Sequence, residues 1–242
     1  MSWRNVVVSS SAKLDYQMGY LVVRKDTTVK VHLSEIRTLL IESTAVSLTA
    51  ALISELIKRK VKVIFCDEKR NPSCELLPYY GAHDSSAKIK KQMEWTEEIK
   101  TDVWTLIVEE KIRKQKENLQ FFKKEEAMML QSYLEELQYG DSTNREGHAA
   151  KVYFNALFGK DFSRNADINI NAALNYGYAI LLSAFNREIV SNGYLTQIGL
   201  FHDNMFNPFN LASDLMEPFR TIIDRRVYLM MLRPSQLDFQ LI

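Results

Sequence analysis

The stretch YGAHDSS at residues 80–86 divides the sequence into two parts of different character. Glycine and short polar residues of this kind mark a connection between structural units. Before it, short runs of β-branched and aromatic residues alternate with turn residues, which is typical of β-strands. After it, apolar residues recur at helical spacing. The sequence therefore predicts an α+β protein, with an N-terminal β-sheet domain at 1–80 and a larger all-α domain at 81–242.

The N-terminal part is predicted to contain a hairpin and one helix among its strands. Residues 14–16 and 20–23 flank Gly19, a spacing typical of a β-hairpin. Residues 47–60 have helically spaced apolar side chains and a basic end, which suits the negative pole of a helix. Further strands are expected at residues 6–8, 29–33, 39–41, 61–66 and 76–79.

The C-terminal part is predicted to consist of long helices. The 242 residues include only 8 glycines and 5 prolines, far fewer than average, and this scarcity favours uninterrupted helices. The dense mixed charge of residues 87–139 indicates a pair of amphipathic helices with solvated faces rather than a nucleic-acid-binding patch. Further helices are expected at residues 144–158, 167–191 and 208–232.

Composition and charge exclude several classes of protein. A hydrophobic content of 46% and a charged content of 25% exclude disordered and collagen-like chains. No apolar run reaches the roughly 18 residues that span a bilayer, and the start lacks the apolar core of a signal peptide, so we expect a cytoplasmic protein. Cys66 and Cys74 have the spacing of neither a zinc site nor a disulfide framework. With a net charge of +1, any DNA binding must rest on local patches.

One motif combines an acidic residue with a glycine at a predicted helix start. Thr143 and Glu146 have the spacing of a capping box, in which the glutamate only satisfies backbone groups of the first turn. Gly147 does not fit a plain cap, because glycine inside a helix costs up to about 1 kcal/mol relative to alanine. We therefore expect another group to approach the backbone closely at Gly147.

Three further polar side chains occur later in the helical part. His202 lies in a polar connection after an apolar stretch, where a single histidine is more often structural than a ligand. Asp214 and Glu217 share a helix face beside an apolar stripe, where carboxylates need a cation or a donor. Arg220 is the simplest partner for Glu217, and Pro218 interrupts the helix between them.

Glu146, His202, Asp214 and Glu217 together could build one divalent-metal site. Carboxylate oxygens suit Mg²⁺ and Mn²⁺, and an imidazole tilts the preference toward Mn²⁺. Their spacing leaves open whether they converge, because the residues belong to separate motifs.

Longer strings around these residues resemble the CRISPR-associated protein 1 family. In the helical part they are NREGHAAKVYFNALFG (144–159), DININAALNYGYAILLSAFNREI (167–189), IGLFHDN (198–204) and FNLASDLMEPFR (209–220). In the N-terminal part, HLSEI (32–36), VIFCDEKRNP (63–72) and LPYYGAHDSS (77–86) resemble the type II members. The motifs occur in the family's order and cover most of residues 1 to 230.

The resemblance implies a spacer-acquisition integrase of the prokaryotic cytoplasm, with DNA endonuclease activity as a side reaction. It implies that Glu146, His202 and Glu217 bind Mg²⁺ or Mn²⁺, and that Asp214 is a nearby acidic member of the catalytic set that holds His202 or a metal-bound water. The 3′-hydroxyl ends of spacer DNA would be joined to the CRISPR repeat by transesterification, with the metal activating the hydroxyl and neutralising charge.

The resemblance also implies partners, and the sequence shows two departures. The partners are double-stranded DNA, as protospacer and as CRISPR repeat, a second copy of the chain bound through a dimerisation domain at 1–80, a dimer of CRISPR-associated protein 2, and the type II accessory ring protein and effector nuclease. Thr221 stands where the family usually has proline. The sequence after Tyr228 does not resemble the family, which predicts a chain shortened at its C-terminus.

Basic residues and two tyrosines are candidates for DNA contacts. Phosphate contacts dominate DNA affinity, and aromatic rings stack on splayed bases. The candidates are Lys58, Arg59, Lys60, Arg145, Lys151, Arg164 and Arg225, together with Tyr176 and Tyr178. For one of the two tyrosines, core packing is an equally good interpretation.

Two other functions stay open. A catalytically weak structural subunit would hold DNA ends without metal-dependent strand transfer. A general metal-dependent nuclease would cut branched DNA regardless of the repeat. Residue spacing does not separate the integrase from the nuclease, whereas the family resemblance favours the integrase.

Overall fold

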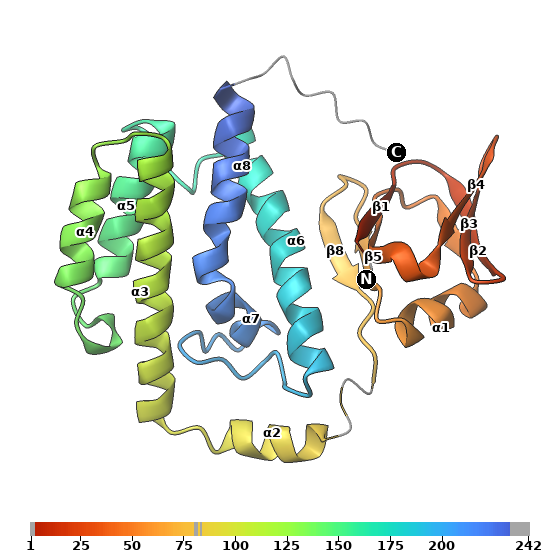
Figure 1. Ribbon diagram of the computed structural model, residues 1–242, viewed down its shortest axis with the longest axis horizontal. Helices are drawn as coiled ribbons and strands as arrows, with labels where there is room; N and C mark the ends of the chain where they lie inside the picture. Colours follow the sequence, from red (N-terminus) through yellow and green to blue (C-terminus); the bar gives the residue numbers. More distant parts are fainter. Residues whose placement is uncertain (1–2, 80–81, 83, 233–242) are drawn as a thin grey trace. The chain divides into compact units, whose positions relative to one another are not determined.

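The computed structural model describes residues 3–79, 82 and 84–232 (Figure 1). They form two compact units, one before residue 80 and one from residue 82 onward. The first unit consists of strands with one α-helix, and the second consists of helices. The predicted α+β fold class, with the larger part helical, is therefore confirmed. The dimerisation role of 1–80 and the catalytic, metal-binding role of 81–242 stay predictions.

Two four-stranded sheets enclose the core of the N-terminal unit. One has the order β1-β5-β7-β8, with β8 antiparallel to three parallel strands, and the other has the order β4-β3-β2-β6. Helix α1 (Ala50–Lys58) covers the core with Leu52 and Leu56, which are fully buried. The strands are Arg4–Val8 (β1), Ala12–Gln17 (β2), Tyr20–Arg24 (β3), Thr28–His32 (β4), Ile36–Ile41 (β5), Val46–Leu48 (β6), Lys62–Cys66 (β7) and Pro72–Glu75 (β8), with a 3₁₀ turn η1 at Leu33–Glu35.

The hairpin predicted at Gly19 is confirmed, whereas the last predicted strand is displaced. Strands β2 and β3 pair up to a two-residue turn of Met18 and Gly19, whose φ angles of 49° and 90° suit the twist of the strands. The strand expected at 76–79 is wrong. The chain returns earlier, as β8, because the carboxylate of Asp67 accepts the backbone N–H of Asn71 at 2.8 Å and closes the turn after β7.

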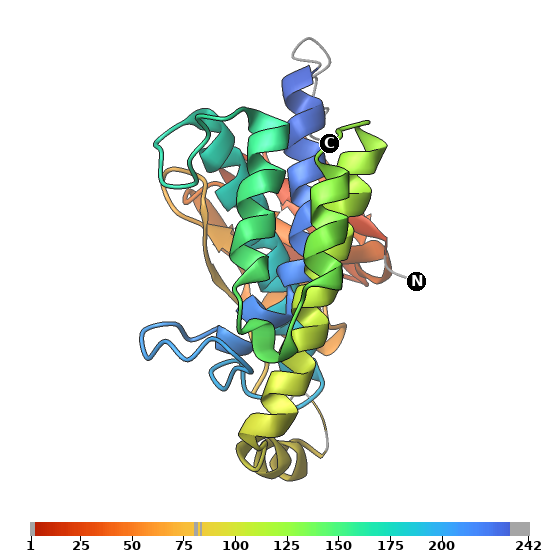
Figure 2. The same ribbon diagram turned by 90° about the vertical axis from the view of Figure 1, so that its left-hand side faces the viewer.

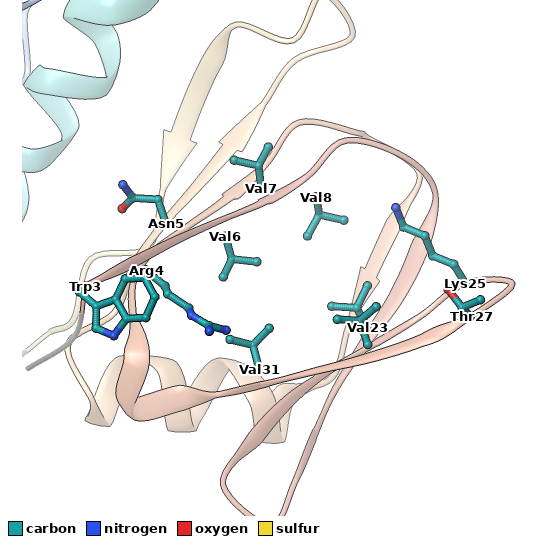
Figure 3. Close-up of a pocket in the computed structure, with 11 residues that line it drawn as sticks. Trp3, Arg4, Asn5, Val6, Val7, Val8, Val23, Lys25, Thr27 and Val31 are labelled. Atoms are coloured by element: carbon teal, nitrogen blue, oxygen red, sulfur yellow. The ribbon is translucent and has the colours of Figure 1, made fainter. Parts of the chain in front are cut away.

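An apolar cleft of about 620 Å³ opens in the N-terminal unit (Figure 3). Val6 and Val8 of β1 line one side, and Val23 of β3 and Val31 of β4 line the other. Among the described strands, β1 and β4 each have a hydrogen-bonded neighbour on one side only. The unit therefore presents two strand edges beside an apolar surface.

Helix α3 (Glu97–Phe121) is the central element of the C-terminal unit. It packs against α4, α5, α8 and η3, and Figure 2 shows α3, α5 and α8 running alongside one another. Helix α6 (Asn169–Ser191) packs along α8. The remaining elements are α2 (Ser85–Met93), α4 (Ala127–Glu135), η2 (Tyr139–Asp141), α5 (Arg145–Phe158), α7 (Asn210–Leu215), η3 (Glu217–Phe219) and α8 (Arg220–Leu232). No helix in the described part of the chain combines the length and apolarity needed to cross a bilayer.

Two predicted helical segments are subdivided in the structure. Residues 87–139 form three α-helices rather than two, because the Thr96 hydroxyl caps the start of α3 and the chain leaves α3 at Lys123, where φ is 55°. The helix predicted at 208–232 is interrupted at Pro218 into α7, η3 and α8, as the missing proline N–H requires.

Candidate active site

Asp141, and not Glu146, caps helix α5. The Asp141 carboxylate accepts the backbone N–H of Arg145 at 2.6 Å and that of Glu146 at 3.1 Å. The buried hydroxyl of Thr143 has no hydrogen-bond partner among the described residues. The capping box expected from Thr143 and Glu146 is therefore wrong, and the Glu146 carboxylate is available for a contact elsewhere.

Gly147 provides the close approach that the sequence predicted. A Cβ atom at this position would lie 2.7 Å from Oδ1 of Asn144. Asn144 has a φ of 53°, so the chain turns sharply just before α5 and folds its side chain against the first turn. Gly147 thus serves the turn that sets the direction of α5.

The fully buried carboxylate of Asp214 organises the loop that carries His202. It accepts the backbone N–H groups of Leu200, Phe201 and His202 at 2.6, 3.2 and 3.1 Å. The ring Nδ1 of His202 donates to the same carboxylate at 2.6 Å. Gly199 leaves room for this arrangement, because a Cβ there would lie 2.8 Å from Oδ2 of Asp214.

Asp214 also determines the electrostatics of His202. Its hydrogen bond raises the pKa of His202 above the usual value, and the charges of Asp214 and Glu217 raise that pKa further. Burial of the ring opposes them by lowering the pKa. Because Nδ1 donates to Asp214, Nε2 is the ring nitrogen left for another ligand. Two roles were expected for Asp214, holding His202 or holding a metal-bound water, and the structure shows the contact with His202.

Glu146 and Glu217 converge on one buried ammonium group, that of Lys111. The Lys111 Nζ forms ion pairs with Glu146 of α5 and with Glu217 of η3. Burial alone would lower the pKa of Lys111, but the charges of Glu217 and Glu146 outweigh it and raise that pKa. Arg220 pairs with the other oxygen of Glu217 at 3.0 Å. Two carboxylates distant in sequence thus meet at one positive charge.

Lys111 was not among the site residues predicted from the sequence, although a signal was present. Lys111 follows Ile107 and Val108, two buried residues of α3, by four and three positions, so it lies on the core-facing side of the helix. A lysine at such a position requires a buried counter-charge. Searching the apolar stripe of α3 for a misplaced charge would have identified it.

The donor chemistry fits a divalent ion, but the three expected ligands do not meet in this structure. Two carboxylates directed at one cation match the oxygen preference of Mg²⁺ and Mn²⁺. Within the described residues, however, no three His, Cys, Asp or Glu side chains form a group that could hold a metal ion. His202 is held by Asp214, and the Lys111 ammonium lies between Glu146 and Glu217. The complete ligand set stays a prediction.

A cavity of about 230 Å³ adjoins the two glutamates. Asp224, which lines it, is buried and accepts a hydrogen bond from the Tyr178 hydroxyl. Burial raises the pKa of Asp224 to about 6. The charged side chains that line the cavity are Lys111, Arg164 and Arg220, and Glu146, Glu217 and Asp224.

The model of one protein family, CRISPR associated protein Cas1, matches residues 6–240. This chain belongs to the Cas1 family. The match continues past Tyr228, so the lack of resemblance expected there is wrong, while residues 233–242 lie outside the described residues. Thr221, the other position where a departure from the family was expected, is buried, and its hydroxyl donates to the carbonyl of Pro218 at 3.1 Å.

The chain is similar to a Cas1 protein in sequence and to two solved structures in fold. The CRISPR-associated endonuclease Cas1 of Neisseria meningitidis serogroup C is 36% identical over 233 residues, which cover 94% of this chain and 75% of that protein. A casposase bound to integration product shares the fold with a TM-score of 0.79 at 21% identity, over 98% of this chain and 75% of that one. A Cas6-RT-Cas1–Cas2 complex shares the fold with a TM-score of 0.71 at 22% identity, over 95% of this chain and 28% of that one.

The Cas1 fold buries one of the two candidate tyrosines. Tyr178 is buried, and the guanidinium carbons of Arg164 and Arg220 lie 5.4 and 4.8 Å from the centroid of its ring. Its ring is therefore part of the core beside the cavity and is not exposed for stacking on a base. Tyr176 is partly exposed and stays a candidate.

The basic candidates differ in how firmly they are engaged. Arg145 pairs with Glu136 at 2.8 Å, and Arg225 donates to Asn118 at 2.7 Å. Arg164 donates to two asparagines and lines the cavity. The exposed candidates are Lys58, Arg59, Lys60 and Lys151.

Proposed function

We propose that this Cas1-family protein is a metal-dependent DNA integrase of CRISPR adaptation. It would join the 3′-hydroxyl ends of spacer DNA to the CRISPR repeat by transesterification, and would cut DNA as a side reaction with water as nucleophile. The observation that carries the proposal is the convergence of Glu146 and Glu217 on one buried cation beside a cavity lined by arginines. Positioned charges of both signs are what phosphoryl transfer requires. The Neisseria relative, an endonuclease by name, supports a nucleic acid as the substrate.

Glu146, His202 and Glu217 would hold the Mg²⁺ or Mn²⁺ ion. When bound, the ion would acidify the attacking hydroxyl and neutralise charge on the phosphate. Two carboxylates and one imidazole accept either ion and favour Mn²⁺. Asp214 keeps Nδ1 of His202 engaged at 2.6 Å and so leaves Nε2 as the coordinating nitrogen.

The arginines of the cavity would stabilise the phosphate that reacts. Arg164 is fixed by hydrogen bonds of 2.6 and 2.7 Å to Asn171 and Asn175, and Arg220 is fixed by Glu217. Guanidinium groups held in place stabilise charge that develops on phosphate oxygens without having to reorganise during the reaction. The attacking group comes from the DNA, so the reaction needs no nucleophile from the protein.

We propose DNA and protein partners for this chain. The two structural relatives are described as a casposase bound to integration product and as a Cas6-RT-Cas1–Cas2 complex. Here we propose double-stranded DNA, as protospacer and as repeat, and a dimer of CRISPR-associated protein 2. We assign the apolar cleft beside β1 and β4 to the homodimer contact of the N-terminal unit. The accessory ring protein, the effector nuclease and the cytoplasmic location stay predictions.

A strand-transfer assay tests this function. A labelled duplex with 3′-hydroxyl ends is mixed with a supercoiled plasmid that carries a CRISPR repeat, CRISPR-associated protein 2, and Mn²⁺ or Mg²⁺. We expect joined product that disappears with EDTA and in Glu146→Gln, and that persists in Glu125→Gln, an exposed control in the same unit. DNA binding without joining would favour the structural subunit. Cutting without joining, whatever the repeat, would favour the general nuclease.

A further inference from the structure

Lys111 occupies an environment that lysine rarely enters. Its side chain is 12% exposed, and its ammonium group pairs with Glu146 and Glu217. Its helical neighbours Val108 and Ile112 are fully buried. A buried ammonium group is kept in such a place by its ionic partners rather than by water. Lys111 and the two glutamates therefore form one electrostatic unit.

The charges around the adjoining cavity balance without any added ion. Its lining holds three cations and three carboxylates, so the formal charge is zero when all are ionised. Among the described cations, Lys111 is the one that pairs with both Glu146 and Glu217, while Arg220 pairs with Glu217 alone. A divalent ion that binds these glutamates would bring two positive charges to the place that the Lys111 ammonium holds.

We propose that Lys111 is the protein's own counter-cation for the metal ligands Glu146 and Glu217. A divalent ion that binds these glutamates displaces the Lys111 ammonium from them, and this competition weakens the binding of the ion. The inference rests on the proposed metal-dependent function. Without a cation between them, two carboxylates directed at one point repel each other. Lys111 removes that repulsion and keeps the pair together. Because the ion must compete with an ammonium group that belongs to the protein, its net gain on binding is smaller than the two carboxylates alone would give.

A purely structural role for Lys111 predicts a different result. If Lys111 only held α3 against α5 and η3, its loss would lower the stability of the unit. The affinity of the folded protein for Mn²⁺ would then stay the same, or would fall as the ligands lost their positions. The direction of the change in Mn²⁺ affinity therefore separates the two roles, without any measurement of catalysis.

Isothermal titration of the full chain with Mn²⁺ alone tests the proposal. Lys111→Met removes the charge and keeps most of the side-chain length, so we expect it to bind Mn²⁺ about tenfold to a hundredfold more tightly than the wild type, the range in which groups around metal ligands act. Lys111→Arg keeps the charge and should stay close to the wild type. The matched control is Lys114→Met, on the same helix, where the half-exposed lysine pairs with Glu110 and Glu117.

The outcomes separate this proposal from the proposed function. Wild type that binds Mn²⁺ at least as tightly as Lys111→Met would overturn the role of Lys111 and leave the metal-dependent function in place. No Mn²⁺ binding by either protein would overturn both. Binding by Lys111→Met alone would support the proposal most directly, because the ammonium would then be the group that keeps the ion out.

A second measurement covers loss of stability, because Lys111→Met leaves the Glu146 carboxylate without its ionic partner and the Glu217 carboxylate with Arg220 alone. We expect its Tm to lie below that of the wild type without added ion, and to rise more than that of the wild type when Mn²⁺ is added, since tighter binding to the folded state gives a larger shift. Equal rises in the two proteins would contradict the proposal. If Lys111→Met does not fold, Lys111→Gln, which keeps a hydrogen-bond donor, takes its place in both measurements.

Discussion

Replacing Asp214 by asparagine should loosen the loop that carries His202 while hardly changing the size of the side chain. In the wild type, Oδ2 accepts the N–H groups of Leu200 and Phe201, and Oδ1 accepts the N–H and the ring Nδ1 of His202. An amide has one accepting oxygen and an NH₂ group that cannot accept. In either orientation of the amide, two of the four donors therefore lose their acceptor.

The magnitude follows from the two lost hydrogen bonds. Hydrogen bonds to a charged group contribute about 1.5–3 kcal/mol each, so the substitution should lower the free energy of unfolding by about 3–6 kcal/mol. For a chain of this size, each kcal/mol lowers Tm by about 2–4 °C, which gives a decrease of roughly 6–24 °C. We expect the lower part of this range, because Phe201 is exposed and the loop can open to water that replaces some of the lost acceptors.

Thermal unfolding followed by circular dichroism and tryptophan fluorescence measures the effect. Trp104 stacks on Phe201 with ring centroids 4.2 Å apart, so its emission reports on this loop. Asp203→Asn is the matched control, because Asp203 adjoins His202 and is exposed, and its Tm should stay within about 2 °C of the wild type, as is usual for surface substitutions. If Asp214→Asn and Asp203→Asn unfold at the same temperature, Asp214 does not anchor the loop and the reasoning is refuted.

Two further predictions concern the core beside the site. The raised pKa of Asp224, about 6, means that the free energy of unfolding of the wild type falls as pH rises from about 4 to 6. Measured by urea unfolding, the free energy of unfolding of Asp224→Asn relative to that of the wild type should therefore increase by about 3 kcal/mol between pH 4 and pH 7. Parallel pH profiles of the two proteins would contradict this. A Cβ at Gly177 would lie 2.3 Å from Cγ2 of Ile223, so Gly177→Ala should cost about 1–3 kcal/mol. The same unfolding assay should find the double variant with Ile223→Ala more stable than the summed single effects, and strict additivity would count against the clash.

Elements that depend on one residue's backbone could be predicted from the sequence. The hairpin at Gly19 and the interruption at Pro218 follow from the dihedral limits of glycine and proline, and both are present. The start of α5 is different, because Thr143 and Asp141 are both suitable caps. The left-handed conformation of Asn144 places the Asp141 carboxylate against the first turn, and no local pattern determines that choice.

The site depends on contacts between distant residues, which spacing rules do not reach. The family resemblance named Glu146 and Glu217, and the structure brings them together. Lys111, which joins them, lies 35 and 106 positions away in the sequence. It stood in a segment whose dense mixed charge indicated solvated helices, so its charge was not distinguished from those of the half-exposed lysines of the same helix. Only its position on the buried stripe of α3 distinguishes it.

The same charge balance bears on how a chain with a net charge of +1 would act on DNA under the proposed function. Basic residues near the site are largely engaged within the protein, Lys111 and Arg220 with glutamates and Arg164 with asparagines. A cavity lining with a formal charge of zero offers a phosphodiester little long-range attraction. Under the proposed function, a divalent ion bound by Glu146 and Glu217 would add two positive charges to this lining, and the site would then favour an anion. Long-range attraction for DNA at this place would then arise with the ion, whereas Arg164 and Arg220 would act on the phosphate at short range, so phosphate recognition and chemistry would depend on the same two glutamates.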